Sequence, residues 1–346
     1  MKQDSLYAVI MAGGRGERFW PAGRKDNPKQ LLPLLGEKTM LEETVLRLFP
    51  LIAPERVMVI TNLDYVDRIR ELLPIPPENI IGEPERRNTA PCVALATALI
   101  RRKDPDATMI LLPADHVIRP AKLFQQTLLA AAEQAQNGKL ATLGILPTYP
   151  ATGYGYIELG DAVNETFHSV KAFREKPDQP TAEQFFLSGN YRWNGGIFVW
   201  RCDVISEEFR KHAPQLSEKL EHWANGGDWQ EDFAQCQKIS IDYAIMEKSR
   251  NVIVGNAPFY WNDIGSWSAL RSVLPKDERG NAARGNVLAI SSNNNVLISD
   301  DDTLLGVIGM NDIAVIKSGN GLLVCPLSEE QRVRELVGQI KDAEFV

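Results

Sequence analysis

A glycine-rich turn near the start of the chain has residue types that can bind a ligand. The apolar run Leu6–Met11 leads directly into Ala12-Gly13-Gly14-Arg15-Gly16-Glu17-Arg18. Glycines in such a turn allow positive φ and close backbone approach, so that N–H groups can bind phosphate. Phe19 at the third glycine position excludes the dinucleotide-binding fingerprint, and the missing GK[ST] ending excludes a Walker A loop. A phosphate loop and an ordinary tight turn stay open.

Two cations and two carboxylates could serve an anionic ligand and its metal. Arg18 ends the turn, and Lys29 follows in the segment Asn27-Pro28-Lys29-Gln30. Asp115 follows the apolar run Thr108–Leu112 and Pro113, and ligands of open parallel sheets gather at such strand ends. Asp263 lies in the segment Tyr260–Trp267. Magnesium takes one or two protein carboxylates and leaves its other positions to phosphate and water, so Asp115 and Asp263 would suffice if they meet.

The segment Glu83–Pro91, which reads EPERRNTAP, lies between an expected strand and an expected helix. Asn88 or Thr89 could simply cap the helix that opens at Ala90. Glu83 suits a guanine base, because guanine N1–H and N2–H₂ are both donors, and uracil, thymine and cytosine lack that paired donor edge. A helix cap and a base-recognition segment are both open here.

Three further segments suit a sugar. Thr152–Glu158 combines glycines, aromatic rings and a carboxylate; Phe173–Pro177 places an acid beside a base; Trp193–Phe198 adds an amide beside a flexible turn. Taken one at a time, the second could be a strand-end turn and the third a hairpin loop.

In this order, the segments resemble those of sugar-1-phosphate nucleotidyltransferases. The string AGGRGERFWPAGRKDNPKQLLPL is similar to the family's triphosphate-binding signature, and EPERRNTAP is similar to the base-recognition segment of its guanylyl branch. The resemblance covers nearly the whole chain. Two positions depart from the family pattern: Gly23 and Gly195 stand where serine is usual.

The resemblance implies a role for each matched position. The implied catalytic cations are Arg18, Lys29 and Lys176, and the implied ligands of Mg²⁺ are Asp115 and Asp263. The implied nucleotide-binding residues are Ala12, Gly13, Gly14, Gly16, Glu83, Asn88, Thr89 and Pro113. The implied sugar-binding residues are Gly155, Tyr156, Glu158, Glu175 and Asn194. The segment Ser240–Lys248 also matches the family, but an acidic helix cap explains Asp242 equally well.

The implied reaction joins GTP and mannose 1-phosphate into GDP-mannose and pyrophosphate. The nearest alternative is a uridylyl- or thymidylyltransferase acting on glucose 1-phosphate. A nucleotide-sensing homologue that has lost its chemistry is a second alternative. Against the latter, Arg18, Lys29, Asp115, Lys176 and Asp263 are all present. No isomerase activity is expected, because the chain ends soon after a small C-terminal unit.

The hydrophobic pattern predicts an α/β fold with a Rossmann-like, mostly parallel sheet flanked by helices. The expected strands are Leu6–Met11, Arg56–Thr61, Asn79–Ile81, Thr108–Leu112, Leu140–Leu146, His168–Arg174 and Ile197–Trp200, and the expected helices are Met40–Phe49, Ala90–Arg102 and Ala121–Gln136. A catalytic domain over residues 1–275 is expected. Over residues 280–346 we expect a small all-β domain, a meander or the coils of a β-helix, closed by a helix at Ser328–Lys341. This β unit could cover the active site or mediate self-association, and we favour a homodimer.

The overall composition limits the partners and the compartment. A net charge of -7, with both signs spread along 346 residues, argues against a nucleic-acid or anionic-membrane partner. The four cysteines form no CxxC pair, which favours free thiols in a reducing compartment over structural zinc. The N-terminal apolar run is too short for a signal peptide, and no stretch is long enough to cross a bilayer. We therefore expect a cytoplasmic protein.

Overall fold

A computed structural model describes residues 5–14 and 16–345 of the chain. The chain divides into two compact units that interleave in sequence. The first, here called the sheet unit, comprises Met1–Gly13, Val45–Pro113 and Ile118–Trp261. The second, here called the β-helix unit, comprises Gly14–Thr44, Ala114–Val117 and Asn262–Val346.

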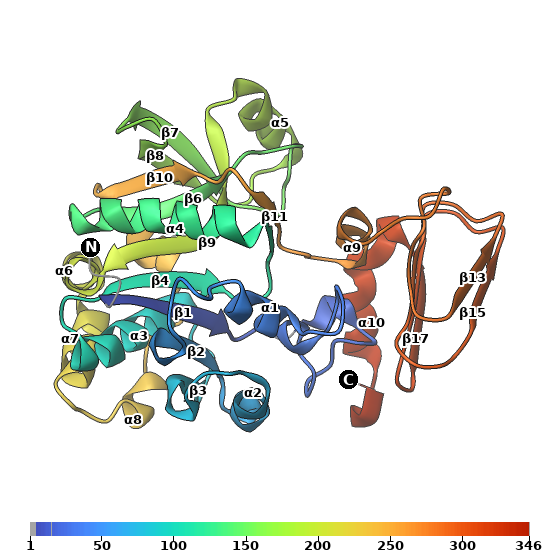
Figure 1. Cartoon of the computed structure of the whole chain (residues 1–346), viewed down its shortest axis with the longest axis horizontal. Helices are drawn as coiled ribbons and strands as arrows, with labels where there is room; N and C mark the ends of the chain where they lie inside the picture. Colours follow the sequence, from blue (N-terminus) through green and yellow to red (C-terminus); the bar gives the residue numbers. More distant parts are fainter. Residues whose placement is uncertain (1–4, 15, 346) are drawn as a thin grey trace. The chain divides into compact units, whose positions relative to one another are not determined.

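The sheet unit is built on one large mixed sheet (Figure 1). In the described part of the chain it has 9 strands in the order β3-β2-β1-β4-β9-β6-β10-β8-β7. Their bounds are β1 Leu6–Ala12, β2 Val57–Asn62, β3 Ile80–Glu83, β4 Thr108–Pro113, β6 Leu140–Ile145, β7 Tyr156–Ala162, β8 Phe167–Arg174, β9 Tyr191–Arg201 and β10 Val252–Asn256. Strands β8 and β9 run antiparallel to their neighbours, and the others share one direction. The predicted mostly parallel α/β sheet is confirmed.

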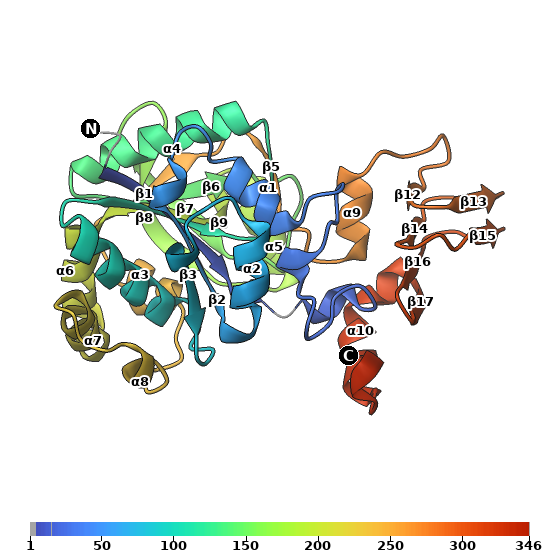
Figure 2. The ribbon, with the colours of Figure 1, turned by 60° about the horizontal axis from the view of Figure 1, so that its bottom comes forward.

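Helices cover both faces of this sheet (Figure 2). Helix α4 (Ala121–Gln136) packs on β4, β6 and β9, and α3 (Thr89–Lys103) packs on β1 and β2. Helices α6 (Cys202–His212) and α7 (Pro214–Ala224) pack against α3. The shorter helices are α1 Met40–Leu46, α2 Val66–Leu72, α5 Gln179–Ser188 and α8 Gln230–Phe233. The alanines of α3 are buried, since small side chains let the helix lie close to the sheet.

The predicted strands and helices before the C-terminal unit lie within one or two residues of the observed ones, except at α1 and β9. Helix α1 ends at Leu46 rather than at Phe49. Strand β9 begins at Tyr191 and runs through Trp193-Asn194-Gly195-Gly196, so the alternative of a hairpin loop there was wrong. The glycines accompany an irregular register against β6, between Thr142 and Gly144, and Gly196 takes a φ of 64°. Strands β7 and β10 were missed.

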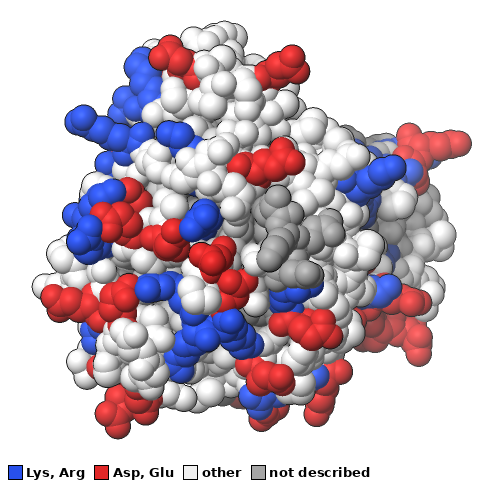
Figure 3. Space-filling view, turned by 60° about the vertical axis from the view of Figure 1, so that its left-hand side comes forward, with Lys and Arg blue, Asp and Glu red and all other residues white. Residues whose placement is uncertain are grey.

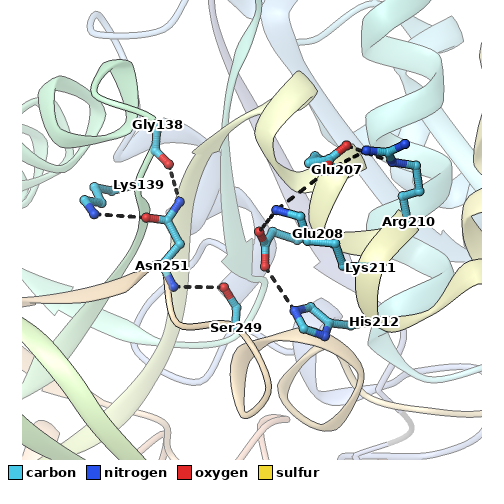
Figure 4. A network of polar contacts seen from close by, with 9 residues as sticks. All are labelled: Gly138, Lys139, Glu207, Glu208, Arg210, Lys211, His212, Ser249 and Asn251. Carbon is cyan, nitrogen blue, oxygen red and sulfur yellow. Dashed lines mark hydrogen bonds and ion pairs between the residues drawn. The ribbon is translucent and has the colours of Figure 1, made fainter.

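A polar network connects the residues just before two neighbouring parallel strands, β6 and β10 (Figure 4). The side chain of Asn251, just before β10, donates to the carbonyl of Gly138, just before β6, and accepts from Lys139 Nζ at 3.0 Å. The Leu140 N–H donates to the Asn251 carbonyl at 3.1 Å. Nearby, Glu208 of α6 accepts from Lys211 at 3.0 Å. Backbone groups that would otherwise lack a partner just before these two strands are thereby paired.

The β-helix unit carries parallel coils rather than a meander. Strands β12 (Ala282–Arg284), β14 (Val296–Ser299) and β16 (Ile313–Ser318) pair in parallel, as do β13 (Val287–Ile290) and β15 (Leu305–Ile308). A meander would pair its neighbours antiparallel. Antiparallel pairing occurs here where β17 (Gly321–Pro326) joins β16. Buried Asn281 and Asn295 bond to each other at 2.9 Å between successive coils, which explains why asparagines separate these strands.

The core of the β-helix unit joins segments from both ends of the chain. Phe19, Trp20, Leu32 and Leu34 pack in one buried cluster with Trp267, Val296, Ile298, Ala314, Ile316 and Val333. Helix α9 (Trp267–Val273) contributes Trp267. The predicted C-terminal helix is a 3-10 turn (Leu327–Arg332) that continues as α10 (Val333–Gln339). Strands β5 (Val117–Arg119) and β11 (Tyr260–Asn262) form a separate two-stranded sheet.

Lys and Arg alternate with Asp and Glu over the face shown in Figure 3. Among the described residues, no helix is long and apolar enough to cross a membrane.

Candidate active site

The glycine turn is packed against the predicted lysine segment within the β-helix unit. Gly16 has a φ of 69°, and a Cβ on it would collide with the backbone nitrogen of Lys29. Only glycine meets both conditions without strain. Gln30 Nε2 donates to the carbonyl of Gly14 at 3.2 Å, which ties the other side of the turn. Arg15 lies outside the described residues.

Lys29 contacts both residues that are predicted to bind the metal, Asp115 through its carboxylate and Asp263 through its main-chain carbonyl. Its side chain is only 10% exposed and forms an ion pair with Asp115, with Nζ 2.8 Å from Oδ2. The same ammonium donates to the main-chain carbonyl of Asp263 and lies 5.7 Å from the centroid of the Phe19 ring. Lys29, Asp115 and Asp263 thus converge in the β-helix unit, although Asp263 lies 234 positions beyond Lys29 in the sequence.

Arg18 completes this cluster. Its NH1 group donates to the Gly265 carbonyl at 2.9 Å, and a Cβ on Gly265 would lie 3.4 Å from that group and 3.2 Å from Asp263 Oδ2. The Asn262 side chain accepts from the Ile264 N–H at 2.7 Å and supports a positive φ of 40° at Ile264. The tight turn at 262–265 therefore presents the Asp263 carboxylate next to a cation.

The electrostatics keep Asp115 ionised. Burial acts to raise the pKa of its carboxyl, but the charge of Lys29, with smaller contributions from His116 and hydrogen bonds, holds the pKa below its usual value. The cluster thus offers anionic oxygen ligands together with two cations. No group of three or more potential metal ligands occurs among the described residues. Two carboxylates fit a hard divalent cation that completes its shell with phosphate and water, and they do not make a closed protein cage.

Glu83 is a buried carboxyl of the segment predicted to recognise the base, in the sheet unit. It ends β3, is 7% exposed, and within the described part of the chain its Oε1 atom has no hydrogen-bond partner. Burial raises the pKa of Glu83 to about 7, while a hydrogen bond from the Cys92 thiol and the charge of Arg86 act in the opposite direction. Its Oε2 lies 3.8 Å from the point where a Cβ on Gly13 would be. A buried acceptor without a donor is costly, so Glu83 suits a ligand that brings donors.

Asn88 caps α3, as the simpler alternative held, and Thr89 is the first residue of the helix. Asn88 has a φ of 67°, and its side chain accepts from the Thr89 N–H at 2.8 Å. The Thr89 hydroxyl accepts from the Ile241 N–H at 2.8 Å. These bonds leave the Asn88 amide nitrogen and the Thr89 hydroxyl hydrogen able to donate, so the predicted nucleotide contacts stay predictions. Ala12 is buried and its carbonyl accepts from Thr61, while Pro113 ends β4.

The predicted hexose residues fall into two groups. Gly155, Glu175 and Asn194 meet, since a Cβ on Gly155 would lie 2.9 Å from Glu175 Oε2 and 3.6 Å from Asn194 Cβ. Lys176 is exposed, has a φ of 35° and pairs with Glu175 at 2.5 Å. This group forms a compact polar surface at the end of β8.

Tyr156 and Glu158 are engaged with other residues. Tyr156 is 0% exposed and its hydroxyl donates to the Ala151 carbonyl at 2.8 Å, so its phenol belongs to the core. Glu158 accepts from Lys171 at 2.5 Å and lies 3.7 Å from Arg174. The hydrogen bond from Lys171 lowers the pKa of Glu158.

Both departures from the family pattern occur where a side chain would be crowded. A Cβ on Gly23 would lie 2.6 Å from the Gly16 carbonyl oxygen, and one on Gly195 would lie 2.9 Å from the Leu143 carbonyl oxygen. A serine at either position would force the backbone to shift. Glycine at 23 and 195 therefore matches the local packing of this chain.

Two further residues contact predicted site residues: Cys92, which the sequence analysis did not consider for the site, and Asp242, which it explained equally well as an acidic helix cap. The Cys92 thiol bonds to Glu83, and Asp242 accepts from the Asn194 amide at 2.8 Å. Burial raises the pKa of Asp242. A cavity of about 320 Å³ lies elsewhere in the sheet unit, lined by His212, Lys219, Cys236, Lys248 and their neighbours. Its described lining includes none of the predicted site residues.

Comparison with known proteins gives a consistent assignment. The nucleotidyl transferase family model matches residues 7–280, and a model of the MannoseP isomerase/GMP-like beta-helix domain matches residues 285–340. A mannose-1-phosphate guanylyltransferase of Klebsiella pneumoniae is 38% identical over 97% of this chain and 74% of its own length. The xanthan biosynthesis protein XanB of Xanthomonas campestris pv. campestris is 38% identical over 98% of this chain and 74% of its own length.

A solved structure covers nearly the whole chain. A Thermus thermophilus protein, described as a mannose-1-phosphate geranyltransferase, superposes with a TM-score of 0.92 at 36% identity, over 98% of this chain and 100% of its own. Nucleotidyltransferases of this kind generally use a divalent metal. Asp115 and Asp263, which Lys29 ties together, carry carboxylates of the type that such a metal binds.

Proposed function

The chain belongs to the nucleotidyl transferase family, among the mannose-1-phosphate guanylyltransferases, and from this premise we propose how its residues transfer GMP from GTP to mannose 1-phosphate with release of pyrophosphate. The observation that carries the proposal is the Lys29 cluster. A buried ammonium beside a glycine turn joins two aspartates, which gives the cation and the metal ligands that triphosphate chemistry requires.

Gly14, Gly16, Arg18 and Lys29 are assigned to the triphosphate. Backbone N–H groups of the turn bind phosphate oxygens, while Arg18 and Lys29 offset the charge that develops on the leaving pyrophosphate. Asp115 and Asp263 would hold Mg²⁺. When bound, Mg²⁺ supplies Lewis-acid polarisation of the phosphate and a template for the triphosphate.

The nucleophile requires no protein base. A phosphate monoester loses its second proton at a pH of about 6, so the mannose 1-phosphate oxygen is anionic at neutral pH and attacks the α-phosphorus in line. The protein therefore has to hold two anions together and screen their repulsion. Lys176, exposed on its strained turn, is assigned to the sugar phosphate.

Glu83 is assigned to the guanine base. Its ionised carboxylate accepts from N1–H and N2–H₂, which fills the buried acceptor that the protein leaves without a donor. Gly13, next to this carboxylate, leaves room for a base because it has no side chain. Asn88 and Thr89 supply further hydrogen-bond donors to the nucleotide. Ala12 and Pro113 line the nucleotide with their backbone, and all four residues lie at strand or helix ends.

The hexose is assigned to the side chains of Glu158, Glu175 and Asn194 and to the backbone of Gly155 and Tyr156. The carboxylates accept hydrogen bonds from sugar hydroxyls, and the amide of Asn194 can both donate and accept hydrogen bonds. Tyr156 contributes through its backbone because its hydroxyl is bonded inside the core.

The test is pyrophosphate release by the purified protein with Mg²⁺, GTP and mannose 1-phosphate, beside UTP or dTTP with glucose 1-phosphate. We expect release in the first mixture alone. Release in a control mixture alone would overturn the substrate assignment, and binding of GTP without release would favour a nucleotide-sensing homologue.

Three further predictions stay proposals. The catalytic domain is assigned to residues 1–275 and the small β domain to 280–346. The protein is proposed to act in the cytoplasm, and to form a homodimer through exposed apolar side chains of the β-helix coils, among them Leu288, Ile290 and Ile308.

A further inference from the structure

The amide of Asn194 is bonded at both ends to other protein groups. Its Nδ2 donates to Asp242 Oδ1 at 2.8 Å, and its Oδ1 accepts from the Gly196 N–H at 3.1 Å. Its own backbone N–H donates to the Gly155 carbonyl at 2.8 Å. The side chain is therefore held in one orientation before any ligand arrives.

The bond from Gly196 determines which end of the Asn194 amide faces Asp242. A backbone N–H can only donate, so Gly196 places the amide oxygen of Asn194 on its own side. The amide nitrogen then faces Asp242, and Asp242 Oδ1 must act as an acceptor. One N–H of Asn194 and one lone pair of its oxygen stay available to a ligand. Asp242 thus determines which group of Asn194 a ligand meets.

The segment that carries Asp242 is itself tied to the base-recognition segment. The Ile241 N–H donates to the Thr89 hydroxyl at 2.8 Å, and the Ala90 N–H donates to the Ile239 carbonyl at 3.1 Å. Asp242 then opens a short π-helical turn, Asp242–Met246, whose residues Ala244, Ile245 and Met246 are buried. Residues 239–242 are therefore anchored on two sides and cannot move independently of the opening of α3.

We propose that Asp242 is the positioning residue of the hexose side: it holds the Asn194 amide in the orientation that meets the sugar, and acts on mannose 1-phosphate through Asn194 rather than by direct contact. This proposal rests on the proposed function, which assigns Asn194 to the hexose. Asp242 would thus restrict the accepted sugars, because a fixed amide cannot rotate to suit a different hydroxyl.

The substitutions Asp242→Ala and Asp242→Asn separate the hydrogen bond from the charge. Asp242→Ala removes the acceptor, and we expect the KM and the calorimetric Kd of mannose 1-phosphate to rise roughly tenfold, the scale of one hydrogen bond to a charged group. The KM of GTP should change less. Asp242→Asn retains an oxygen that can accept from Asn194, and it should recover most of the affinity. Tyr243→Phe, at an exposed neighbouring residue, is the matched control.

A double-mutant cycle with Asn194→Ala distinguishes positioning from direct contact. If Asp242 acts through Asn194, Asp242→Ala has little further effect on the Kd in the Asn194→Ala background. Additive effects of the two substitutions would overturn the proposal, and so would an Asp242→Ala protein that loses thermal stability but retains its affinity for mannose 1-phosphate.

The proposed function can fail separately. If the wild-type protein turns over only UTP or dTTP with glucose 1-phosphate, the substrate assignment is wrong, and the same cycle measured with glucose 1-phosphate still decides whether Asp242 acts through Asn194. If GTP and mannose 1-phosphate are the substrates and the cycle is additive, the function stands and the role of Asp242 is rejected.

Discussion

Each unit contains a group of polar residues, and the two groups differ in how their charges are compensated. In the β-helix unit, Lys29 and Asp115 form a largely buried ion pair, and Arg18 and Lys29 both donate to carbonyls of the 263–265 turn. In the sheet unit, Glu83 and Asp242 are carboxyls whose pKa values are raised by burial, and Glu83 has an oxygen without a partner among the described residues. The first group is compensated by an ion pair, whereas over the described part of the chain the carboxyls of the second have no ion-pair partner of this kind.

This difference suits the ligands proposed for each group. Phosphates and a metal ion carry full charges, so a site for them needs cations and carboxylates that stay ionised and are held rigidly by one another. A base and a sugar present neutral donors, and an under-satisfied buried carboxyl discriminates strongly between ligands that bring those donors and ligands that do not. The paired group suits catalysis and the unpaired group suits specificity.

The largest expected effect concerns the paired group. Lys29→Ala removes one charge-assisted interaction with the triphosphate, and we expect kcat to fall up to about 100-fold. Steady-state kinetics with GTP and mannose 1-phosphate measure this. Lys25→Ala, at an exposed lysine near the same turn, should leave kcat unchanged. A folded Lys29→Ala protein with a normal rate would exclude Lys29 from the mechanism. The paired group could then no longer be assigned to catalysis in contrast to the unpaired group.

The second prediction concerns the carboxylates of the same group. Asp115→Ala and Asp263→Ala should each raise the Mg²⁺ concentration needed for half-maximal rate by at least about tenfold, because each removes a ligand. Asp115→Ala should also lower the melting temperature, since it leaves the buried Lys29 without its ion pair. Asp263→Ala retains the main-chain carbonyl that accepts from Lys29, and so should lower the melting temperature less than Asp115→Ala does. Asp26→Ala is the surface control, and an unchanged Mg²⁺ requirement in both variants would move the metal site elsewhere.

The third prediction tests the unpaired group through pH. The pKa of Glu83 is raised from 4.5 to about 7, so the folded state holds this proton more tightly than the unfolded state. The stabilising contribution is present below pH 4.5 and is lost as pH rises through 7, by about 3 kcal/mol in total. Glu83→Gln should remove this loss, which thermal melts of both proteins across pH 4.5 to 7 would show as a difference in slope.

The same carboxyl should affect GTP in the opposite sense. Only the ionised form accepts from both guanine donors, so the KM of GTP should fall as pH rises through 7, and Glu83→Gln should raise the KM about 2- to 10-fold at pH 8 and flatten its profile. Glu85→Gln, two residues away and exposed, is the control. Parallel pH profiles in the wild-type and Glu83→Gln proteins would mean that the carboxyl does not read the base.

The smallest expected effect separates packing from recognition. Tyr156→Phe removes a buried hydrogen bond to the Ala151 carbonyl and should cost about 1 kcal/mol of unfolding free energy. The KM of mannose 1-phosphate should stay unchanged, because the hydroxyl does not reach a ligand. Chemical denaturation and kinetics measure the two quantities, with Tyr149→Phe as an exposed control. A raised KM would place the phenol in the sugar site after all.

The sequence predicted the parts of the fold and the site that depend on local patterns. Strand β1 and its glycine turn were predictable because a continuous apolar run ends in residues that tolerate positive φ. Strands β7 and β10 were missed: β7 includes a glycine and an aspartate in its second half, and β10 has only 5 residues and includes a glycine and an asparagine. The family resemblance supplied the site residues, whose individual roles stay predictions.

The convergence of distant residues could not be predicted from the pattern. Nothing in the spacing indicates that Lys29 pairs with Asp115, or that Thr89 accepts from the backbone of Ile241, 152 residues away. Such contacts depend on the three-dimensional path of the chain. Raised pKa values depend on burial, which is also set by that path.

The shared core of the β-helix unit has a consequence for the order in which the protein can form during synthesis. Phe19, Trp20, Leu32 and Leu34 leave the ribosome early, but their apolar partners Val296, Ile298, Ala314 and Ile316 leave it much later. The glycine turn beside Phe19 therefore has to wait, with its flanking hydrophobic residues uncovered, until the β-helix coils have been translated. Contacts this distant in sequence close slowly, so this stretch is where a nascent chain would most need a chaperone.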